Sequence, residues 1–408
     1  MKAWERRLKD LSMILNTCHR YYFEPERFRL SLNQFLQTSR TVTFIIQKKK
    51  DEIPDFDKWY EQATLFWKHD KILLWAKDSR NVIEKMGDLD LFSFIKISLV
   101  RSYIEAQDTV VQIQEDKYLF VAITEIYNYL KTELTFISDD EWAIKVERRW
   151  TANTLPNEEL LWVLNMIYYH QYQICKEACN QVGSTLSTEI PEPIEMDTGL
   201  KDSRHIRYID SEGQEFKQLK AFRIDRDPGF KANKKLLDKQ RERFKKIDNF
   251  EVGMEILSNN AAELFIHDGY HIPMLFSFDS KMNLIDLISA AFYNSAVKFI
   301  FWREIADRLA SQNPYCMYFV SEAWIRKMPD DISRYHAISS LPIRGEMLQV
   351  VGITNKGEFL HKCFEITRHR FDHPTLGECK SIYNDDGKIP QFLQPVAEAI
   401  SIKRRENV

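Results

Sequence analysis

A chain of 408 residues is long enough for two or three domains, each with a core of its own. Its 44% hydrophobic and 29% charged content is typical of a globular protein. Lysine and arginine total 57 against 60 aspartate and glutamate, which gives a formal net charge of −3. This balance excludes a protein whose whole surface attracts nucleic acid, so any basic surface must be local.

The start of the chain and its cysteines predict a cytoplasmic protein. Residues 1–7 are charged where a signal peptide needs an apolar core, and no anchor motif closes the chain. Six cysteines are scattered without the spacing of a disulfide framework, as is typical of reduced thiols. The most apolar stretch, Leu284 to Trp302, contains Asp286, Asn294 and Lys298. We therefore interpret it as a buried helix and expect no membrane association.

Helical periodicity dominates the first part of the chain. Apolar residues recur at steps of three and four over residues 2–22 and 28–46, and the second stretch ends in the cations Lys48 to Lys50, which suit a helix C-terminus. A third stretch runs from Phe56 to Gly87, where either one long helix or two in tandem would fit. The patterns that follow predict strands at 94–103, 110–113 and 143–150, and helices at 118–130 and from Pro156 toward Gly183.

Residues 183–203 have the composition of an exposed connection, with a Gly-Ser-Thr-Leu-Ser-Thr run followed by Glu-Ile-Pro-Glu-Pro. We therefore predict a helical bundle with inserted short strands over residues 1–182, a linker over 183–203 and an α+β domain over 204–408.

Hairpin signals characterise the second part. Asp268-Gly269 lies between the apolar runs 264–266 and 272–276, and Pro273 favours an edge strand there. Asn355-Lys356-Gly357 similarly joins 349–351 to 359–360. We expect a helix over roughly 284–310 between the two hairpins, then a strand at 315–320. This order predicts a sheet with a helix packed on one face, and an α+β fold for the whole chain.

One short motif carries a functional hypothesis. Arg80 and Asn81 are followed by three residues and then Lys85. This pattern, with the helices of residues 2–87, resembles the HEPN superfamily of small helical bundles, many of whose members are metal-independent RNases. The resemblance covers about a fifth of the chain. It implies that Arg80, Asn81 and Lys85 form the catalytic site, that two bundles face each other in a homodimer, and that the protein acts in a toxin–antitoxin or antiviral defence context.

The chemistry of that site depends on its third residue. An RNase without a metal needs a base that titrates near neutral pH and a guanidinium that grips phosphate oxygens. The family carries histidine where this chain carries Lys85, and an exposed lysine, with a reference pKa of about 10.4, is a poor base at neutral pH. Phosphate binding remains open, and His69 is the nearest other imidazole along the chain. Alternatively, Arg80 and Glu84 form an ordinary surface ion pair.

A second candidate surface is a basic amphipathic helix within residues 231–246. Its cations surround the apolar Leu236, Leu237, Phe244 and Ile247, and such a helix could lie along an RNA backbone. The alternative is a helix that is merely solvated on its charged face, because Asp238 and Glu242 dilute the charge. The candidate nucleic-acid-binding residues are Lys234, Lys235, Lys239, Arg241 and Arg243.

Two further groups of polar residues are weaker candidates. The potential zinc ligands His361, Cys363, His369, His373 and Cys379 lack familiar zinc spacing, so we predict no metal site. Glu322, Arg344 and Glu346 lie near predicted strand ends, where either an ion pair or an acid–base site could form. No Gly-rich phosphate loop and no Gly-x-Ser-x-Gly elbow occurs, and we expect no cofactor.

Taken together, these patterns favour a non-catalytic module that binds RNA, a nucleotide or a protein partner. The first alternative is a metal-independent RNase in which Lys85 or His69 replaces the usual histidine. The second is a structural or interaction protein without nucleic acid.

Overall fold

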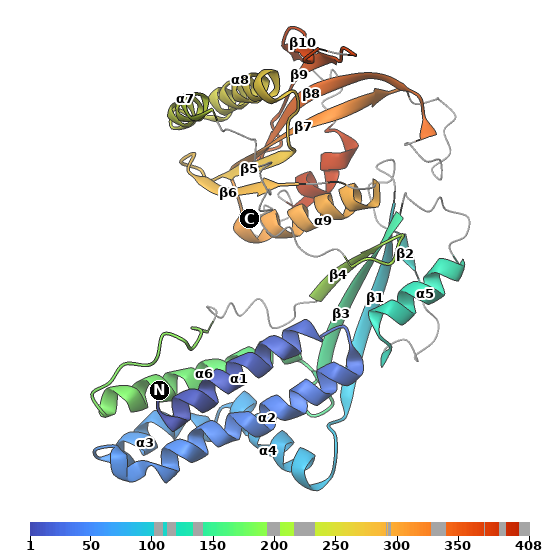
Figure 1. The fold of residues 1–408 in the computed structure, drawn as a ribbon. Helices are drawn as coiled ribbons and strands as arrows, with labels where there is room; N and C mark the ends of the chain where they lie inside the picture. Colours follow the sequence, from blue (N-terminus) through green and yellow to red (C-terminus); the bar gives the residue numbers. More distant parts are fainter. Residues whose placement is uncertain are drawn as a thin grey trace. The chain divides into compact units, whose positions relative to one another are not determined.

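The computed structural model describes most of the chain, in two compact units (Figure 1). The described residues are 1–101, 109–111, 120–133, 142–193, 205–215, 233–290, 292, 295–327, 340–370, 372–382 and 389–399. Unit 1 comprises Met1–Ile97, Val110–Glu133 and Val146–Arg207. Unit 2 comprises Ser98–Thr109, Leu134–Lys145 and Tyr208–Val408. Part of the predicted linker, residues 194–203, lies outside the described residues. The α+β class predicted from the sequence is confirmed.

Long helices form the core of unit 1. Helix α1 packs against α2 and α6, and α2 also contacts α4. Their buried faces are the apolar stripes that the sequence shows, including Leu8 and Leu15 of α1 and Phe28 and Phe35 of α2, all almost fully buried. The helices of this unit are α1 (Ala3–Arg20), α2 (Pro25–Lys48), α3 (Phe56–Thr64), α4 (Lys71–Lys85), α5 (Ile123–Glu133) and α6 (Leu160–Gln181), with short 3-10 turns η1 (Lys50–Glu52) and η2 (Leu65–Lys68).

The third apolar stretch folds as separate helices. Helix α3 ends at Thr64, the turn η2 follows, and α4 begins after Asp70. Asp70 caps α4, because its carboxylate accepts a hydrogen bond from the Leu73 amide at 2.9 Å. An N-cap aspartate within a periodic stretch is enough to start a new helix without any glycine or proline.

A four-stranded sheet has the order β2-β1-β3-β4. Its strands are β1 (Leu91–Arg101), β2 (Thr109–Val111), β3 (Trp142–Ala152) and β4 (His205–Asp210). The strands predicted near residues 94–103, 110–113 and 143–150 are therefore confirmed within the described residues, whereas 102–103 and 112–113 lie outside them. Strand β4 was not predicted, since it is short and follows the segment read as a linker.

Unit 2 is built on an antiparallel sheet with the order β10-β9-β8-β7-β5-β6, and β11 also pairs with β9. Its strands are β5 (Met274–Phe278), β6 (Leu284–Ser289), β7 (Cys316–Arg326), β8 (Ile343–Thr354), β9 (Phe359–Thr367), β10 (Thr375–Leu376) and β11 (Lys380–Ser381). Its helices are α7 (Lys234–Phe244), α8 (Phe250–Asp268) and α9 (Ser295–Gln312), with the turn η6 (Gln391–Leu393).

Both faces of this sheet are buried over its middle strands. One face packs against α8 in a cluster that includes Phe250, Phe265 and Val350, and the other packs against α9 in a cluster that includes Trp302 and Val351 (Figure 1). Helix α8 approaches the sheet closely because Gly253 lies over Tyr318, where any Cβ would collide with the phenol. The sequence predicted a helix on one face of this sheet, and the structure has a helix on each face.

Two predictions in this unit are wrong. The Asp268-Gly269 pair is the end of α8 and not a hairpin turn, and Gly269 has the left-handed conformation (φ 80°) of a helix C-cap. Residues 264–266 are therefore helical, and β5 beyond Pro273 is an inner strand between β6 and β7. The helix expected over 284–310 is the edge strand β6 followed by α9. Short apolar runs such as 284–289 are compatible with either structure.

The second predicted hairpin is confirmed. Strands β8 and β9 pair in register from Glu346–Ile366 to Ile353–Phe359, and Gly357 in the turn has a positive φ of 84°. The strand expected at 315–320 is the first half of β7. None of the helices in the described ranges combines the length and the hydrophobicity needed to cross a bilayer.

Candidate functional site

The residues of the Arg-Asn-x3-Lys motif lie at the end of α4. The Arg80 guanidinium is 2.8 Å from the Glu84 carboxylate, and its other terminal nitrogen donates to the Asn81 side-chain oxygen at 3.2 Å. The Arg80 and Glu84 side chains are each about one-third exposed, and Lys85 is exposed in the last turn. The guanidinium is therefore occupied by its own helix, as expected for a surface ion pair at i, i+4 spacing.

His69, the imidazole nearest to this motif along the chain, is not placed to complete it. His69 is exposed and lies before the start of α4, eleven residues from Arg80. At a rise of about 1.5 Å per residue the two are separated by roughly 16 Å along the helix axis. A general base and a phosphate-binding group must both lie within hydrogen-bond reach of one scissile phosphodiester. His69 and Arg80 therefore do not form one cleavage site.

The predicted nucleic-acid-binding residues on α7 divide into two groups. Lys239 and Arg243, here called the inner cations, both contact Glu263 of α8, at 2.9 and 2.8 Å. Burial acts to raise the pKa of Glu263, but the hydrogen bonds from Lys239 and Arg243 outweigh it and hold that pKa below its ordinary value. Between them the buried Gln240 donates to the Asn260 carbonyl at 3.1 Å. The inner cations thus attach α7 to α8.

The outer cations are Lys234, Lys235 and Arg241 of α7 and Lys246, which lies just after the end of that helix. All four are exposed, and none forms a salt bridge with a residue in the described part of the chain. Lys245 differs from them, because it is 2.7 Å from Glu242. Lys234 and Lys235 stand in the first turn of α7, where the positive end of the helix dipole disfavours cations unless an anion is near. The structure therefore separates a pair of cations that attaches α7 to α8 from exposed cations that share their part of the chain with the exposed Asp238 and Glu242.

The carboxylates nominated at strand ends converge on an arginine that the sequence did not single out. Arg368 lies 2.5 Å from both Glu322 and Glu346, and Trp324 donates its indole N–H to Glu346 at 3.1 Å. Arg344 is exposed and forms no ion pair with Glu322 or Glu346. Glu322 of β7 and Glu346 of β8 share one cationic partner, Arg368, which directly follows β9. We therefore interpret the cluster as a structural ion-pair network that links these three strands.

The histidines and cysteines do not form a metal centre within the described residues, where no three potential ligands come together. His361 lies 3.1 Å from the Gln349 side-chain oxygen, and burial lowers the pKa of His361 to about 4. His267 pairs with Asp268 at 2.6 Å, and His373 packs beside Gly269. These side chains have separate local partners.

A buried polar network in unit 1 was missed from the sequence. Tyr22 donates to Glu159 at 2.7 Å and accepts from the Trp150 amide at 3.0 Å, while Glu159 caps α6 by accepting from the Trp162 amide at 2.8 Å. His205 lies 3.6 Å from the same carboxylate. Burial raises the pKa of Tyr22, so the phenol stays a donor at neutral pH. The network ties β3 and β4 to the α1–α2 turn, and no spacing in the sequence signals it.

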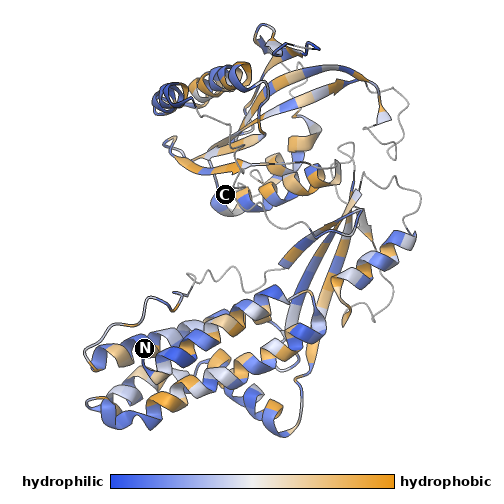
Figure 2. Cartoon of the chain, viewed as in Figure 1, coloured by the Kyte–Doolittle hydropathy of each residue, from blue (hydrophilic) through white to orange (hydrophobic). Residues whose placement is uncertain are grey.

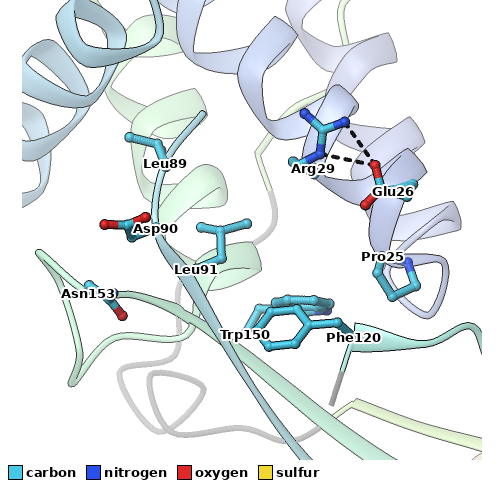
Figure 3. A pocket seen from close by; sticks show the side chains of 9 residues that line it. All are labelled: Pro25, Glu26, Arg29, Leu89, Asp90, Leu91, Phe120, Trp150 and Asn153. Atoms are coloured by element: carbon cyan, nitrogen blue, oxygen red, sulfur yellow. Dashed lines mark hydrogen bonds and ion pairs between the residues drawn. The ribbon is translucent and has the colours of Figure 1, made fainter. Parts of the chain in front are cut away.

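Beside this network lies a small pocket of about 230 Å³ (Figure 3). Arg29 on its wall is already held by Glu26, at 2.8 Å, and by Asp88. With Asp90 also on the rim, carboxylates outnumber cations, which is the opposite of what a nucleotide phosphate requires. The volume is also below the 300 Å³ or more of typical ligand sites. The lining residues are Pro25, Glu26, Arg29, Leu89, Asp90, Leu91, Phe120, Trp150 and Asn153.

Comparison with known proteins places the whole chain in one family. A family model described as bacteriophage lambda protein ea47 matches residues 1–399. The chain is 37% identical over 407 residues to Protein ea47 of Escherichia phage lambda, a match that covers 98% of this chain and 97% of that protein. The chain belongs to the phage lambda ea47 family. No solved structure matches it.

Membership of the ea47 family shows that the HEPN interpretation was wrong. The ea47 match extends through both units, whereas the HEPN resemblance depended on one short motif and the first helices. Arginine, asparagine and lysine are common on helix surfaces, so a pattern of three such residues arises readily by chance. The homodimer and the defence context that HEPN implied lose that basis.

Proposed function

We propose that this ea47-family protein is a non-catalytic RNA-binding protein that holds the RNA backbone through the outer cations of α7. The observation that carries the proposal is the division of the α7 charges. Glu263 pairs with both Lys239 and Arg243, whereas Lys234, Lys235, Arg241 and Lys246 are exposed and form no such pair with α8. Exposed cations along one helix can contact several backbone phosphates, and this kind of contact requires no particular base sequence.

The contacts of Arg80 on α4 and the position of His69 support binding without cleavage. Arg80 is held by Glu84, and His69 lies too far along the chain to act with it. The larger group of exposed cations is instead on α7, which carries no histidine. An RNA partner also agrees with the cytoplasmic location that we expect for the chain.

The proposal predicts a salt-dependent affinity that depends on three residues. The variant with Lys234→Glu, Lys235→Glu and Arg241→Glu should bind a fluorescein-labelled single-stranded RNA of mixed sequence roughly a hundredfold more weakly than the wild type at low salt. If these side chains meet three phosphates, the slope of log affinity against log salt concentration should fall by about 2. Fluorescence anisotropy at a series of KCl concentrations measures both quantities.

A matched control has the same change in net charge at another site. The Lys48→Glu, Lys49→Glu, Lys50→Glu variant reverses three exposed lysines at the end of α2 and should keep the affinity and slope of the wild type. Equal losses in both variants would show that only the overall charge matters, which contradicts the proposed site. A wild-type protein that does not bind RNA at low salt would favour the interpretation as a structural or interaction protein.

A further inference from the structure

The basic surface of α7 accounts for attachment to an RNA backbone but not for a choice between single-stranded and duplex RNA. Figure 2 shows α7 mainly in the hydrophilic colour, next to the more hydrophobic α8. The one aromatic residue of α7, Phe244, packs inward against Phe278 of β5, with the ring centroids 5.7 Å apart. Both kinds of RNA carry phosphates, whereas only a single strand offers unstacked bases to a protein. A group that distinguishes the two therefore has to lie on another element.

Strand β7 carries an exposed aromatic ring. Of the nine tryptophans in the chain, all within the described residues, only Trp324 is exposed, at 59%. Its indole N–H donates to Glu346 at 3.1 Å, and the Arg326 guanidinium lies 5.6 Å from the ring centroid. These contacts hold the ring in place while more than half of its surface faces solvent.

Trp324 is on the same face of the sheet as α7 and α8. Val320 of β7 packs in the α8 cluster, and side chains alternate along a strand, so Trp324 points to that face as well. Phe244 attaches α7 to the same cluster. Arg368, which shares Glu346 with Trp324, also donates to the Gly269 carbonyl at 3.4 Å. The ring therefore lies just beyond the end of α8.

One RNA strand is long enough to contact both α7 and Trp324. Phe278, against which α7 packs, pairs with Cys316, eight residues before Trp324 on β7. At about 3.3 Å per residue these two positions are roughly 26 Å apart. About eight nucleotides span that length at the roughly 3.4 Å rise of a stacked strand.

The charges around Trp324 favour a phosphate-bearing ligand. The two nearest carboxylates, on β7 and β8, both pair with Arg368. Arg326, Lys327 and Arg344 form no salt bridge with any residue in the described ranges. The register of β7 and β8 also shifts at Arg344, and such bulges are common beside binding sites, where they redirect side chains. Excess cations beside a flat exposed ring are the combination that binds single strands.

We propose that the RNA bound by this protein is single-stranded and that Trp324 stacks on one of its bases. The inference rests on the proposed RNA-binding function, because the outer cations attach the backbone and Trp324 adds selection for an unstacked base. Stacking uses only the flat face of a base, so the selection is for single strands and not for sequence. A duplex keeps its bases stacked on one another and engages the outer cations alone.

Replacing the ring tests this contact. Trp324→Ala should bind a single-stranded RNA of about 16 nucleotides roughly tenfold more weakly than the wild type, and a duplex of the same sequence equally well. Its slope of log affinity against log salt concentration should not change, since no charge is lost. Trp324→Phe keeps a stacking ring and should lose about threefold at most. Phe44→Ala, which removes a 49% exposed ring beside Lys48, is the matched control and should keep both affinities.

Cross-linking of the wild-type protein provides a second measurement that does not depend on the folding of a variant. A single strand that carries 5-bromouracil should, on ultraviolet irradiation, form its main protein adduct at Trp324, located by mass spectrometry of the digested protein. Adducts at other residues only would overturn the proposal. So would an unchanged single-strand affinity in Trp324→Ala, or equal losses for single strand and duplex.

The outcomes separate this inference from the proposed function. A wild type that binds neither RNA contradicts both. If reversal of the outer cations weakens binding of both RNAs while Trp324→Ala binds the single strand as the wild type does, RNA binding stands and the Trp324 contact is wrong. Anisotropy titrations with the two labelled RNAs make the comparison.

Discussion

Helices α4 and α7 both carry the cations on which a phosphate-binding function could rest, but their counter-charges differ. On α4 the carboxylate of Glu84 lies one turn from Arg80 and pairs with it. On α7 the principal carboxylate, Glu263, comes from α8 and reaches only Lys239 and Arg243. The number of cations on a helix therefore says little about binding. What matters is which of them the fold leaves unpaired.

Removing the counter-charge on each helix should have the largest effect on RNA binding. Glu263→Gln should free Lys239 and Arg243, raise RNA affinity about tenfold at low salt and steepen the salt slope by about 1.4. Glu84→Gln removes one carboxylate from α4 and is the matched control, with an expected change in affinity below twofold. Anisotropy titrations of the two variants measure the difference. An equal gain in both would remove the distinction between the helices.

Lowering the pH should remove the stabilisation that Glu263 gives the fold, as Glu263→Gln does. The pKa of Glu263 is lower in the folded protein than its ordinary value of 4.5, so its ion pairs stabilise the fold fully above that value. This stabilisation is lost as the pH falls through the lowered pKa of the folded state. Above pH 5 the wild type should therefore resist urea better than Glu263→Gln. As the pH falls below 4.5 the two denaturation curves should approach each other, and a constant gap down to the lowest pH would contradict the assignment.

The smallest effect is expected at the α4 motif. Arg80→Ala breaks the Arg80–Glu84 pair, and exposed pairs at this spacing contribute only about 0.3–0.5 kcal/mol to the free energy of unfolding. RNA affinity should be unchanged within error. Urea denaturation and anisotropy measure the two quantities, with Arg80→Lys as the charge-conserving control. A large loss of RNA binding in Arg80→Ala alone would return α4 to the functional site.

Much of the fold could be predicted because it depends on local periodicity. The apolar stripes of α1, α2 and α6 and the turn at Gly357 were readable, since each pattern spans few residues and has one stable outcome. The Asp268-Gly269 pair was not, because the same dipeptide ends a helix or turns a hairpin. Only the packing of Phe265 and Leu257 of α8 against the sheet decides between those structures.

The candidate site was predictable in part. The sequence identified the α7 cations, and it placed Glu322 and Glu346 near predicted strand ends, but it did not single out Arg368, which pairs with both. It could not separate inner from outer cations, because Glu263 lies twenty residues beyond Arg243 and on another helix. The Tyr22–Glu159 hydrogen bond joins residues 137 positions apart, and no local pattern reports such a pair.

The sequence by itself determined the α+β class, the principal helices and the surface on α7 that carries excess positive charge. These follow from side-chain periodicity and composition, which act over one or two turns. Only the tertiary structure decided which of those charges are neutralised, that residues 284–289 form an apolar edge strand, and that Arg80 belongs to a surface ion pair. Those outcomes depend on which side chains distant segments bring within about 4 Å, where ion pairs form and apolar groups pack.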